Sequence, residues 1–162
     1  MTDTPLRPWP GSAPLDPVRR LRALAAGVRG ARVTVREVDA PCSAVEPLLA
    51  DVDGALAALV PDMRRLRLVR TEGDRVEAVA RSRFGMRARF HGVRRPGYLW
   101  MQSRFVLIGI AATPSAHAPG RTLVAFTGGV RVPGRAALVP VGVGRAGRRV
   151  LDRLAARLAP PP

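Results

Sequence analysis

The sequence contains no lysine, no asparagine and only one cysteine, Cys42. A single cysteine excludes an intrachain disulfide, and with it the disulfide-stabilised scaffolds of small secreted proteins. Cys42, His91 and His117 together cannot complete a four-ligand zinc site without carboxylates. We therefore expect no metal site in this protein.

Long hydrophobic runs are also absent. No uncharged apolar stretch approaches the roughly 18 residues that a membrane span needs. The opening residues, MTDTPLRPWPGSAPL, lack the apolar centre of a signal peptide. These two absences predict a bacterial-type protein that stays in the cytoplasm.

Acidic residues are few: 12 aspartates and glutamates face 27 basic residues, all of them arginine, which gives a formal net charge of +15. Mutational bias towards GC-rich codons, in a composition of the actinobacterial type, produces such an arginine excess without selection for a basic surface. The charge would still attract nucleic-acid phosphates and anionic lipid headgroups. Binding to RNA or to an anionic membrane is therefore one functional hypothesis.

What the sequence does contain fits one globular domain of 162 residues, 47% of them hydrophobic and 24% charged. Residues 1–14 are rich in proline and have no periodicity, which predicts a disordered tail. Asp16 and Pro17 are typical of a helix start. Residues 15–30 then predict an amphipathic helix, whose apolar stripe comprises Leu15, Val18, Leu21, Leu24 and Val28.

A change of hydrophobic period marks the start of the main domain. Residues 31–38 alternate like a half-buried strand until an Ala-Pro pair breaks the pattern. Ser43, with Glu46 three residues later, predicts a capping box for the following helix; alternatively, that helix begins at Pro47. A second short apolar helix is expected at residues 55–60.

About six consecutive antiparallel strands are expected up to residue 130. Between residues 75 and 91, apolar side chains occupy the even positions and mainly arginines the odd ones. This alternation predicts one buried and one solvent-exposed face, with a turn or bulge at Gly85. The run FVLIGIAA, residues 105–112, is apolar on both faces and needs two covers. One is the core helix, and the other is either the segment at 16–28 or a second subunit of a homodimer.

The end of the chain predicts a long helix from Ala136 to Ala159, in which Pro140 either kinks the first turns or marks the true start. Apolar residues fall on its inner face and arginines on its outer face. The order of elements is therefore a strand, two short helices, about six strands and a long helix, which predicts an α+β fold.

The stretch VREVDAPCSAVEPLLADV, residues 35–52, resembles the opening pattern of the START-like helix-grip superfamily, also known as SRPBCC or as polyketide cyclase/dehydrase and coenzyme-Q-binding-like proteins. The resemblance covers the domain that we place at residues 31–160. It departs from the family at Glu46, where an aromatic residue is usual. It implies a curved antiparallel sheet of about seven strands wrapped around the C-terminal helix, with a cavity between them.

The resemblance implies that this cavity binds or carries a hydrophobic small molecule, such as a lipid, an isoprenoid or a polyketide-like compound. One alternative is a polyketide aromatase/cyclase-type enzyme using the same cavity. Another is a basic module that binds RNA, the ribosome or an anionic membrane, because the family includes ribosome-associated toxins. The residues expected to line the cavity are Phe84, Met86, Phe90, Tyr98, Trp100, Gln102, Phe126, Val143 and Gly147.

No catalytic residue is identified from the sequence. Residues 142–147 spell G-x-G-x-x-G, but no βαβ unit and no acidic residue about 20 positions later follow, so we expect no dinucleotide and no other cofactor. His117 lies in a proline-rich loop that either closes over the pocket or is solvated. The arginines on the outer strand face are interpreted as a solvated surface, with phosphate binding as the alternative.

Overall fold

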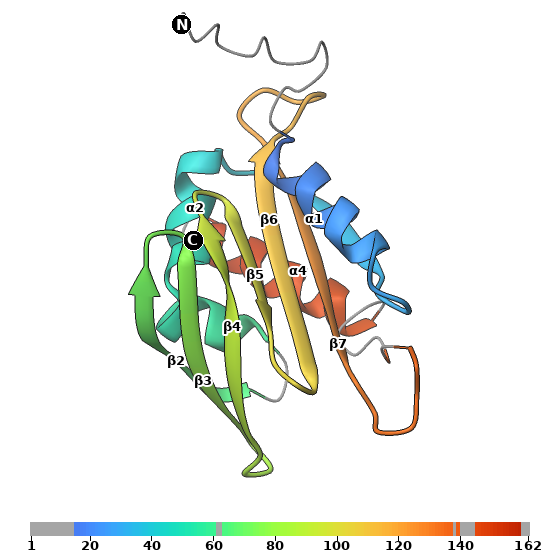
Figure 1. The fold of residues 1–162 in the computed structure, drawn as a ribbon. Helices are drawn as coiled ribbons and strands as arrows, with labels where there is room; N and C mark the ends of the chain where they lie inside the picture. The colour runs from blue at the N-terminus through green and yellow to red at the C-terminus, as the bar shows by residue number, and fades with distance from the viewer. Residues whose placement is uncertain (1–14, 61–62, 138, 140–144, 160–162) are drawn as a thin grey trace, which may run out of the picture.

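The computed structural model describes residues 15–60, 63–137, 139 and 145–159. A seven-stranded antiparallel sheet forms its centre, in the spatial order β1-β7-β6-β5-β4-β3-β2 (Figure 1). Its strands are β1 (Val33–Val38), β2 (Met63–Glu72), β3 (Arg75–Ser82), β4 (Arg87–Arg95), β5 (Tyr98–Gln102), β6 (Val106–Pro114) and β7 (Thr122–Val130). The predicted α+β class and strand number are confirmed. The predicted tail at residues 1–14 lies outside the described residues.

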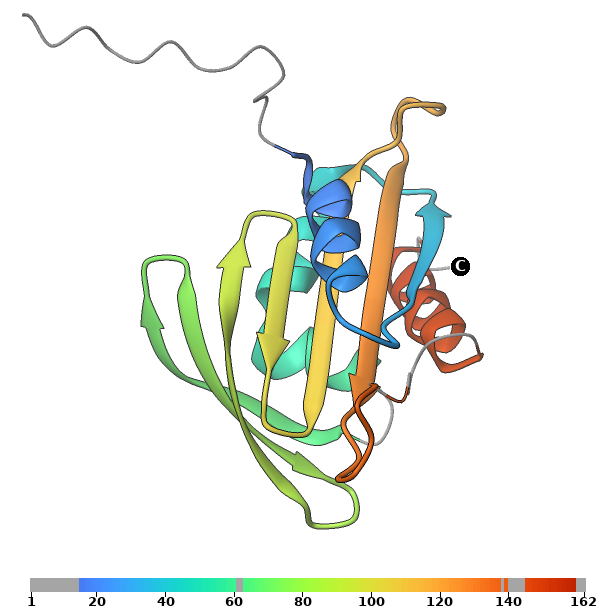
Figure 2. The same ribbon diagram turned by 45° about the vertical axis from the view of Figure 1, so that its right-hand side comes forward.

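Helices cover both faces of the curved sheet (Figures 1 and 2). The concave face carries α2 (Cys42–Ala50), the π-helical turn η1 (Val52–Leu56), the short α3 (Ala57–Leu59) and α4 (Arg145–Leu158). The opposite, convex face carries α1 (Pro17–Ala26). The sheet therefore separates two hydrophobic clusters.

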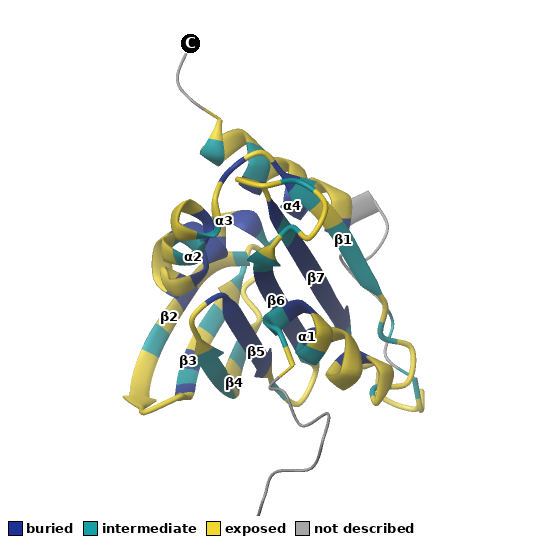
Figure 3. Ribbon diagram, turned by 90° about the horizontal axis from the view of Figure 1, so that it is seen from above, coloured by how far each residue is buried: buried dark blue, intermediate teal, exposed yellow. Residues whose placement is uncertain are grey.

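Strand β6 is buried on both faces because it lies between these clusters. Ile108 and Ile110 join the cluster under α2, η1, α3 and α4, whereas Leu107 and Ala111 join the cluster under α1. Seen from above, β5, β6 and β7 form the most buried part of the sheet (Figure 3). The second cover that FVLIGIAA requires is thus α1 of the same chain.

Helix α1 begins as predicted. Pro17 is its first residue, and Asp16 caps it by accepting a hydrogen bond at 2.9 Å from a backbone amide three residues further on. Its apolar stripe is narrower than predicted, because Leu21 is buried whereas Leu15 and Leu24 are exposed. Leu21 therefore packs against the sheet, whereas Leu15 and Leu24 of the predicted stripe remain in solvent.

The predicted capping box is wrong. Helix α2 begins at Cys42, directly after Pro41, so Ser43 lies inside its first turn, and within the described chain no side chain caps it. Pro47 lies inside the helix rather than at its start. The side-chain cap belongs to η1 instead, where the two carboxylate oxygens of Asp51 accept backbone amides at 2.9 and 3.0 Å.

The C-terminal helix is shorter than predicted. It begins at Arg145, whereas the apolar spacing placed its start at Ala136. Val139 forms an antiparallel bridge with Val130, with both N–H···O distances at 2.8 Å. The residue before a proline is biased away from helical geometry, which accounts for extended Val139. Pro140 itself and the glycine-rich residues 142–144 lie outside the described part of the chain.

Candidate ligand-binding pocket

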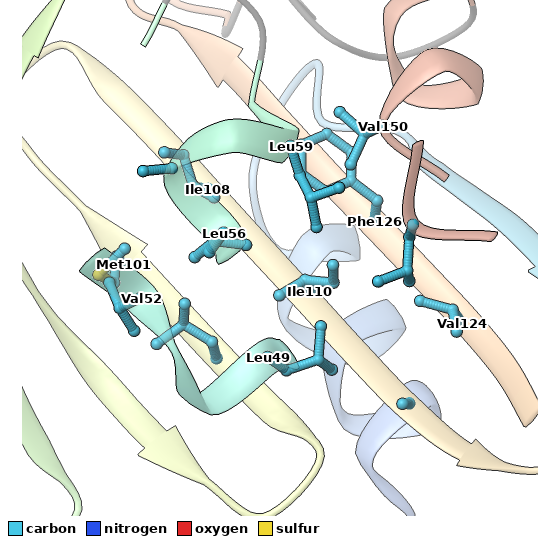
Figure 4. Close-up of a cluster of buried hydrophobic side chains, with 14 of the residues drawn as sticks. Leu49, Val52, Leu56, Leu59, Met101, Ile108, Ile110, Val124, Phe126 and Val150 are labelled. Atoms are coloured by element: carbon cyan, nitrogen blue, oxygen red, sulfur yellow. The ribbon is translucent and has the colours of Figure 1, made fainter. Parts of the chain in front are cut away.

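Side chains fill most of the space between the concave face and the helices. Leu56 and Leu59 from the helical turns pack against Met101, Ile108 and Ile110 from the sheet, and all five are almost completely buried (Figure 4). Helix α4 adds its buried residues Val150, Leu151 and Leu154 where it packs on β7, β1 and α3. The predicted large cavity along the C-terminal helix is therefore mostly core.

A smaller pocket remains at the end of the sheet where the β3–β4 and β5–β6 turns lie. Its volume is about 280 Å³. The side chains come from the end of α3 and from five strands and their turns: Val60, Met63, Ala80, Arg81, Ser82, Phe84, Met86, Arg87, Ala88, Phe90, Phe105, Val106, Leu107, Ile108, Phe126, Gly128, Gly129 and Val130. Among these described residues, only two arginines and one serine have polar side chains.

Small residues at facing positions create this space. Ala80 and Ala88 are directly opposite each other on β3 and β4. On β7, Gly128 and Gly129 come two and three residues after Phe126. Because glycine has no side chain, this part of β7 leaves space in the pocket. These positions were not among the predicted cavity residues, although two alanines on an inner strand face and a Gly-Gly pair indicate missing side-chain volume.

The β3–β4 turn positions the outer wall of the pocket. Ser82 Oγ accepts hydrogen bonds from the backbone amides of Phe84 at 3.2 Å and Met86 at 3.1 Å, and Gly85 adopts a left-handed φ of 83°. The prediction that Gly85 divides two strands is confirmed. Phe84 and Met86, which we expected to line the cavity, line this pocket from an exposed turn rather than from a buried strand face. Their role in ligand binding stays a prediction.

Phe90 and Phe126, which we expected to line the cavity, form the inner wall of this pocket. Their contact with a ligand stays a prediction. Gly147 is buried in α4 and is not among the residues that line the pocket. Val143 lies outside the described residues. The C-terminal helix thus contributes less to the pocket than expected.

The prediction that Tyr98, Trp100 and Gln102 line the cavity is corrected. The three residues share one strand face, as expected, but the β4–β5 register places Trp100 opposite Val93 and Gln102 opposite His91 on the convex face. Tyr98 and Trp100 pack under α1, and Gln102 is exposed. A strand pattern shows which residues share a face, and the hairpin register decides which face it is.

The Tyr98 hydroxyl is an unusual polar group within the described part of the chain. It is buried, and no described residue provides it with a hydrogen-bond partner. Burial raises the pKa of Tyr98 above its ordinary value, and the nearby Arg20 and Arg95 oppose this increase. Burial also raises the pKa of the half-buried Cys42 thiol, against a hydrogen bond to Thr122. Neither group lines the pocket.

Acid–base groups do not gather at the pocket. His117 lies in the β6–β7 loop, at the end of the sheet opposite the pocket (Figure 1), so it does not close over the pocket mouth. Glu77 and His91 are 3.9 Å apart on the convex face. No group of three or more candidate metal ligands occurs in the described residues. Within the same residues, no helix is both long enough and apolar enough to span a membrane.

Comparison with known proteins gives matches at the level of structure. No family model and no curated protein matches the sequence. The solved KanY protein has a TM-score of 0.59 and 11% identity, over 80% of this chain and 97% of that chain. The TTHA0849 protein of Thermus thermophilus has a TM-score of 0.55 and 16% identity, over 79% of this chain and 96% of that chain.

A START superfamily protein from Mycobacterium smegmatis has a TM-score of 0.52 and 15% identity, over 79% of this chain and 96% of that chain. Identities this low establish a shared fold and no shared activity. Since the likeness spans nearly the whole of each matched structure, the chain has the START-like helix-grip fold that its opening strand-to-helix motif predicted.

Proposed function

We propose that the protein binds a hydrophobic small molecule, such as a lipid, isoprenoid or polyketide-like compound, in the pocket at the β3–β4 end of the sheet. One observation carries the proposal: all four phenylalanines of the chain, Phe84, Phe90, Phe105 and Phe126, line this pocket. Aromatic residues make up only 4% of the sequence, so this concentration is not a by-product of composition.

The size and polarity of the pocket limit the ligand. Its volume of about 280 Å³ lies at the lower end of the usual range for small-molecule sites, roughly 300–1,000 Å³. The pocket therefore suits one or two rings, or one end of a longer apolar chain. Arg81 and Arg87 lie at the edge of the pocket. They alternate with Ala80 and Ala88, so they supply positive charge and hydrogen-bond donors at the rim rather than inside the apolar space.

The polar lining favours binding over polyketide cyclisation. A cyclase that moves protons needs a general base close to the substrate. Arginine stays protonated and cannot accept a proton at neutral pH. Ser82 Oγ already accepts the two backbone hydrogen bonds that hold the β3–β4 turn. The described lining therefore provides recognition and orientation of a ligand, and we propose a carrier or sensor of that ligand.

The proposal is tested with the neutral fluorescent probe N-phenyl-1-naphthylamine, whose emission rises in apolar surroundings. We expect saturable binding to the wild type. Ala80→Phe places a large side chain in the pocket and is expected to weaken probe binding by about tenfold or more, since even one extra methylene in an apolar pocket changes binding by roughly 1–3 kcal/mol. Ala88→Phe, on the facing strand, should have the same effect.

Val79→Phe is the matched control, because Val79 is the neighbour of Ala80 on β3 and points to the opposite, convex face. This variant should bind the probe like the wild type. Mass spectrometry of the denatured wild type should also detect a co-purified apolar compound that Ala80→Phe lacks. Equal probe binding by Ala80→Phe and Val79→Phe would contradict the proposal.

A further inference from the structure

Three segments that are far apart in the sequence lie at the same end of the sheet as the pocket. They are the β3–β4 turn at residues 83–86, the β5–β6 turn at 103–105 and the segment after β7 at 131–135, and they lie at the same end of the sheet in both ribbon views (Figures 1 and 2). The Arg131 backbone amide donates to the Phe105 carbonyl at 2.7 Å, which joins the last two segments. We call these segments the tip.

The tip carries exposed apolar side chains. Phe84 is 72% exposed, Met86 70%, Phe105 45% and Val132 42%. Elsewhere in the described chain, the large hydrophobic residues with comparable exposure are dispersed over α1 and the outer strands. Isolated exposed apolar residues need no explanation, but a group of them around a pocket mouth indicates an interaction surface.

The charge of the tip has one sign. The three tip segments, residues 83–86, 103–105 and 131–135, contain four arginines and no aspartate or glutamate, and Arg81 and Arg87 flank the first of them. Two of these arginines lie against exposed rings: the Arg83 guanidinium is 5.2 Å from the Phe84 ring centroid, and that of Arg104 is 5.3 Å from the Phe105 ring centroid. The apolar tip is thus surrounded by positive charge.

We propose that the tip docks on an anionic lipid bilayer. Phe84, Met86 and Phe105 enter the interfacial layer, where aromatic side chains are favoured, and the arginines contact headgroup phosphates. This inference rests on the proposed function, since docking would open the apolar pocket directly to the bilayer. A hydrophobic ligand would then pass between bilayer and pocket without crossing water.

A bilayer suits the tip better than RNA does. Bases stack on aromatic rings, yet Met86 and Val132 provide exposed aliphatic surface that single-stranded RNA does not use. An RNA site would instead use the arginines of β2 and β3 on the convex face, such as Arg67 and Arg75, which lie away from the tip. The two surfaces can therefore be tested separately.

The experiment is co-sedimentation of the full chain with vesicles of phosphatidylcholine containing about 30% phosphatidylserine, compared with phosphatidylcholine alone. We expect binding to the anionic vesicles that falls steeply with added salt. The variant Arg83→Gln/Arg104→Gln/Arg131→Gln should bind about 100-fold more weakly, because each arginine near an anionic surface contributes roughly fivefold. Val132→Ser, which changes no charge, should weaken binding several-fold.

The control variant Arg22→Gln/Arg67→Gln/Arg75→Gln removes the same charge from exposed positions on α1, β2 and β3. It should retain most of the vesicle binding. Three outcomes would overturn the inference: no vesicle binding by the wild type, an equal loss in both triple variants, or binding to poly(U) RNA that the control triple abolishes while vesicles are not bound.

Failure of this inference can be distinguished from failure of the proposed function. The tip arginines chosen for substitution do not line the pocket, so the tip triple variant should bind N-phenyl-1-naphthylamine normally in vesicle-free buffer. Ala80→Phe should lose the probe and still bind anionic vesicles. Vesicle binding with unaltered probe binding in Ala80→Phe would support docking and contradict the pocket.

Discussion

At the scale of single residues, Tyr98 combines packing with an unsatisfied polar group. Its side chain is 3% exposed and belongs to the cluster under α1, where the Arg20 guanidinium lies 5.8 Å from the ring centroid. The ring contributes apolar burial, whereas the hydroxyl has no partner in the described chain. A buried hydroxyl without a hydrogen bond destabilises a fold by about 1–3 kcal/mol.

Tyr98→Phe is therefore expected to raise the free energy of unfolding by about 1 kcal/mol, because it removes the unsatisfied hydroxyl and keeps the ring. Tyr98→Ala should lower it by about 3–5 kcal/mol, since it also removes the buried ring. Urea unfolding followed by circular dichroism measures both. A less stable Tyr98→Phe would show that the hydroxyl is hydrogen-bonded in solution.

The same residue predicts part of the alkaline stability. The pKa of Tyr98 is raised by burial, so the folded state keeps the phenol proton to a higher pH than the unfolded state does. Its contribution to stability is complete below about pH 10, the ordinary tyrosine pKa, and is lost as the pH rises through the raised folded value. Since Tyr98 is the only tyrosine, tyrosinate absorbance reports this titration directly. In Tyr98→Phe, the free energy of unfolding should fall less steeply as the pH rises above about 10.

At the scale of elements, α1 lies close to the sheet because β6 has a glycine beneath it. A Cβ atom on Gly109 would lie 2.7 Å from Leu21 Cδ1 and 3.0 Å from Trp100 Cε3. No side chain fits between the helix and the strand at that point. Leu21 therefore packs directly on the convex face, whereas Leu24, one turn further along α1, is 45% exposed.

Leu21→Ala should destabilise the protein by about 2–5 kcal/mol, since it removes a fully buried side chain and leaves a cavity under α1. Leu24→Ala is the matched control on the same helix and should change the free energy of unfolding by less than about 0.5 kcal/mol. Thermal or urea unfolding of the two variants measures the difference. Similar losses in both would mean that α1 packs on the sheet through another face.

At the scale of the whole molecule, the dominant property is the net charge of +15. The sheet register adds local repulsion, because Arg65 is opposite Arg81, and Arg81 is opposite Arg87. Like charges directly opposite each other on neighbouring strands are destabilising. The ion pair between Arg70 and Glu72 on outer strand β2, at 3.1 Å, is largely exposed and contributes little to stability.

Added salt should therefore stabilise the fold. Raising the ionic strength from about 0.01 M to about 0.15 M shortens the Debye length from roughly 30 Å to roughly 8 Å, which screens the repulsion between surface arginines. We expect the Tm measured by calorimetry to rise by a few degrees. Arg81→Gln, in the centre of the arginine row, should show a smaller rise than Arg22→Gln on α1. A Tm that is independent of salt would contradict this electrostatic interpretation.

Elements with a strong local signal were predicted well. The Asp16-Pro17 pair predicted the start of α1 because capping depends only on neighbouring residues. The even–odd alternation around Gly85 predicted β3 and β4 because a strand has a period of two. The capping box at Ser43 failed because Pro41 already fixes the entry to α2, and the helix start at Ala136 failed because Val139 pairs with Val130 instead.

The candidate site was predictable only in part. Phe90 and Phe126 lie at the pocket because their alternation placed them on the inner face of the sheet, which the pocket adjoins; a role in ligand binding stays a prediction. Tyr98 and Trp100 were assigned to the wrong face because alternation groups residues without orienting them. Phe105, Ala80 and Ala88 were missed because a pocket is the volume that neighbouring side chains leave unfilled, and these neighbours come from distant strands.

The sequence by itself determined the order of the elements, the α+β class and the resemblance of residues 35–52, since all three depend on local spacing. Only the tertiary structure decided that α1 covers β6, that the core fills the space beside α4, and that the phenylalanines surround one pocket at the tip. The reason is physical: periodicity acts along one chain segment. Which face of the sheet is covered, how the core is packed and where a cavity remains depend on which segments pack against each other.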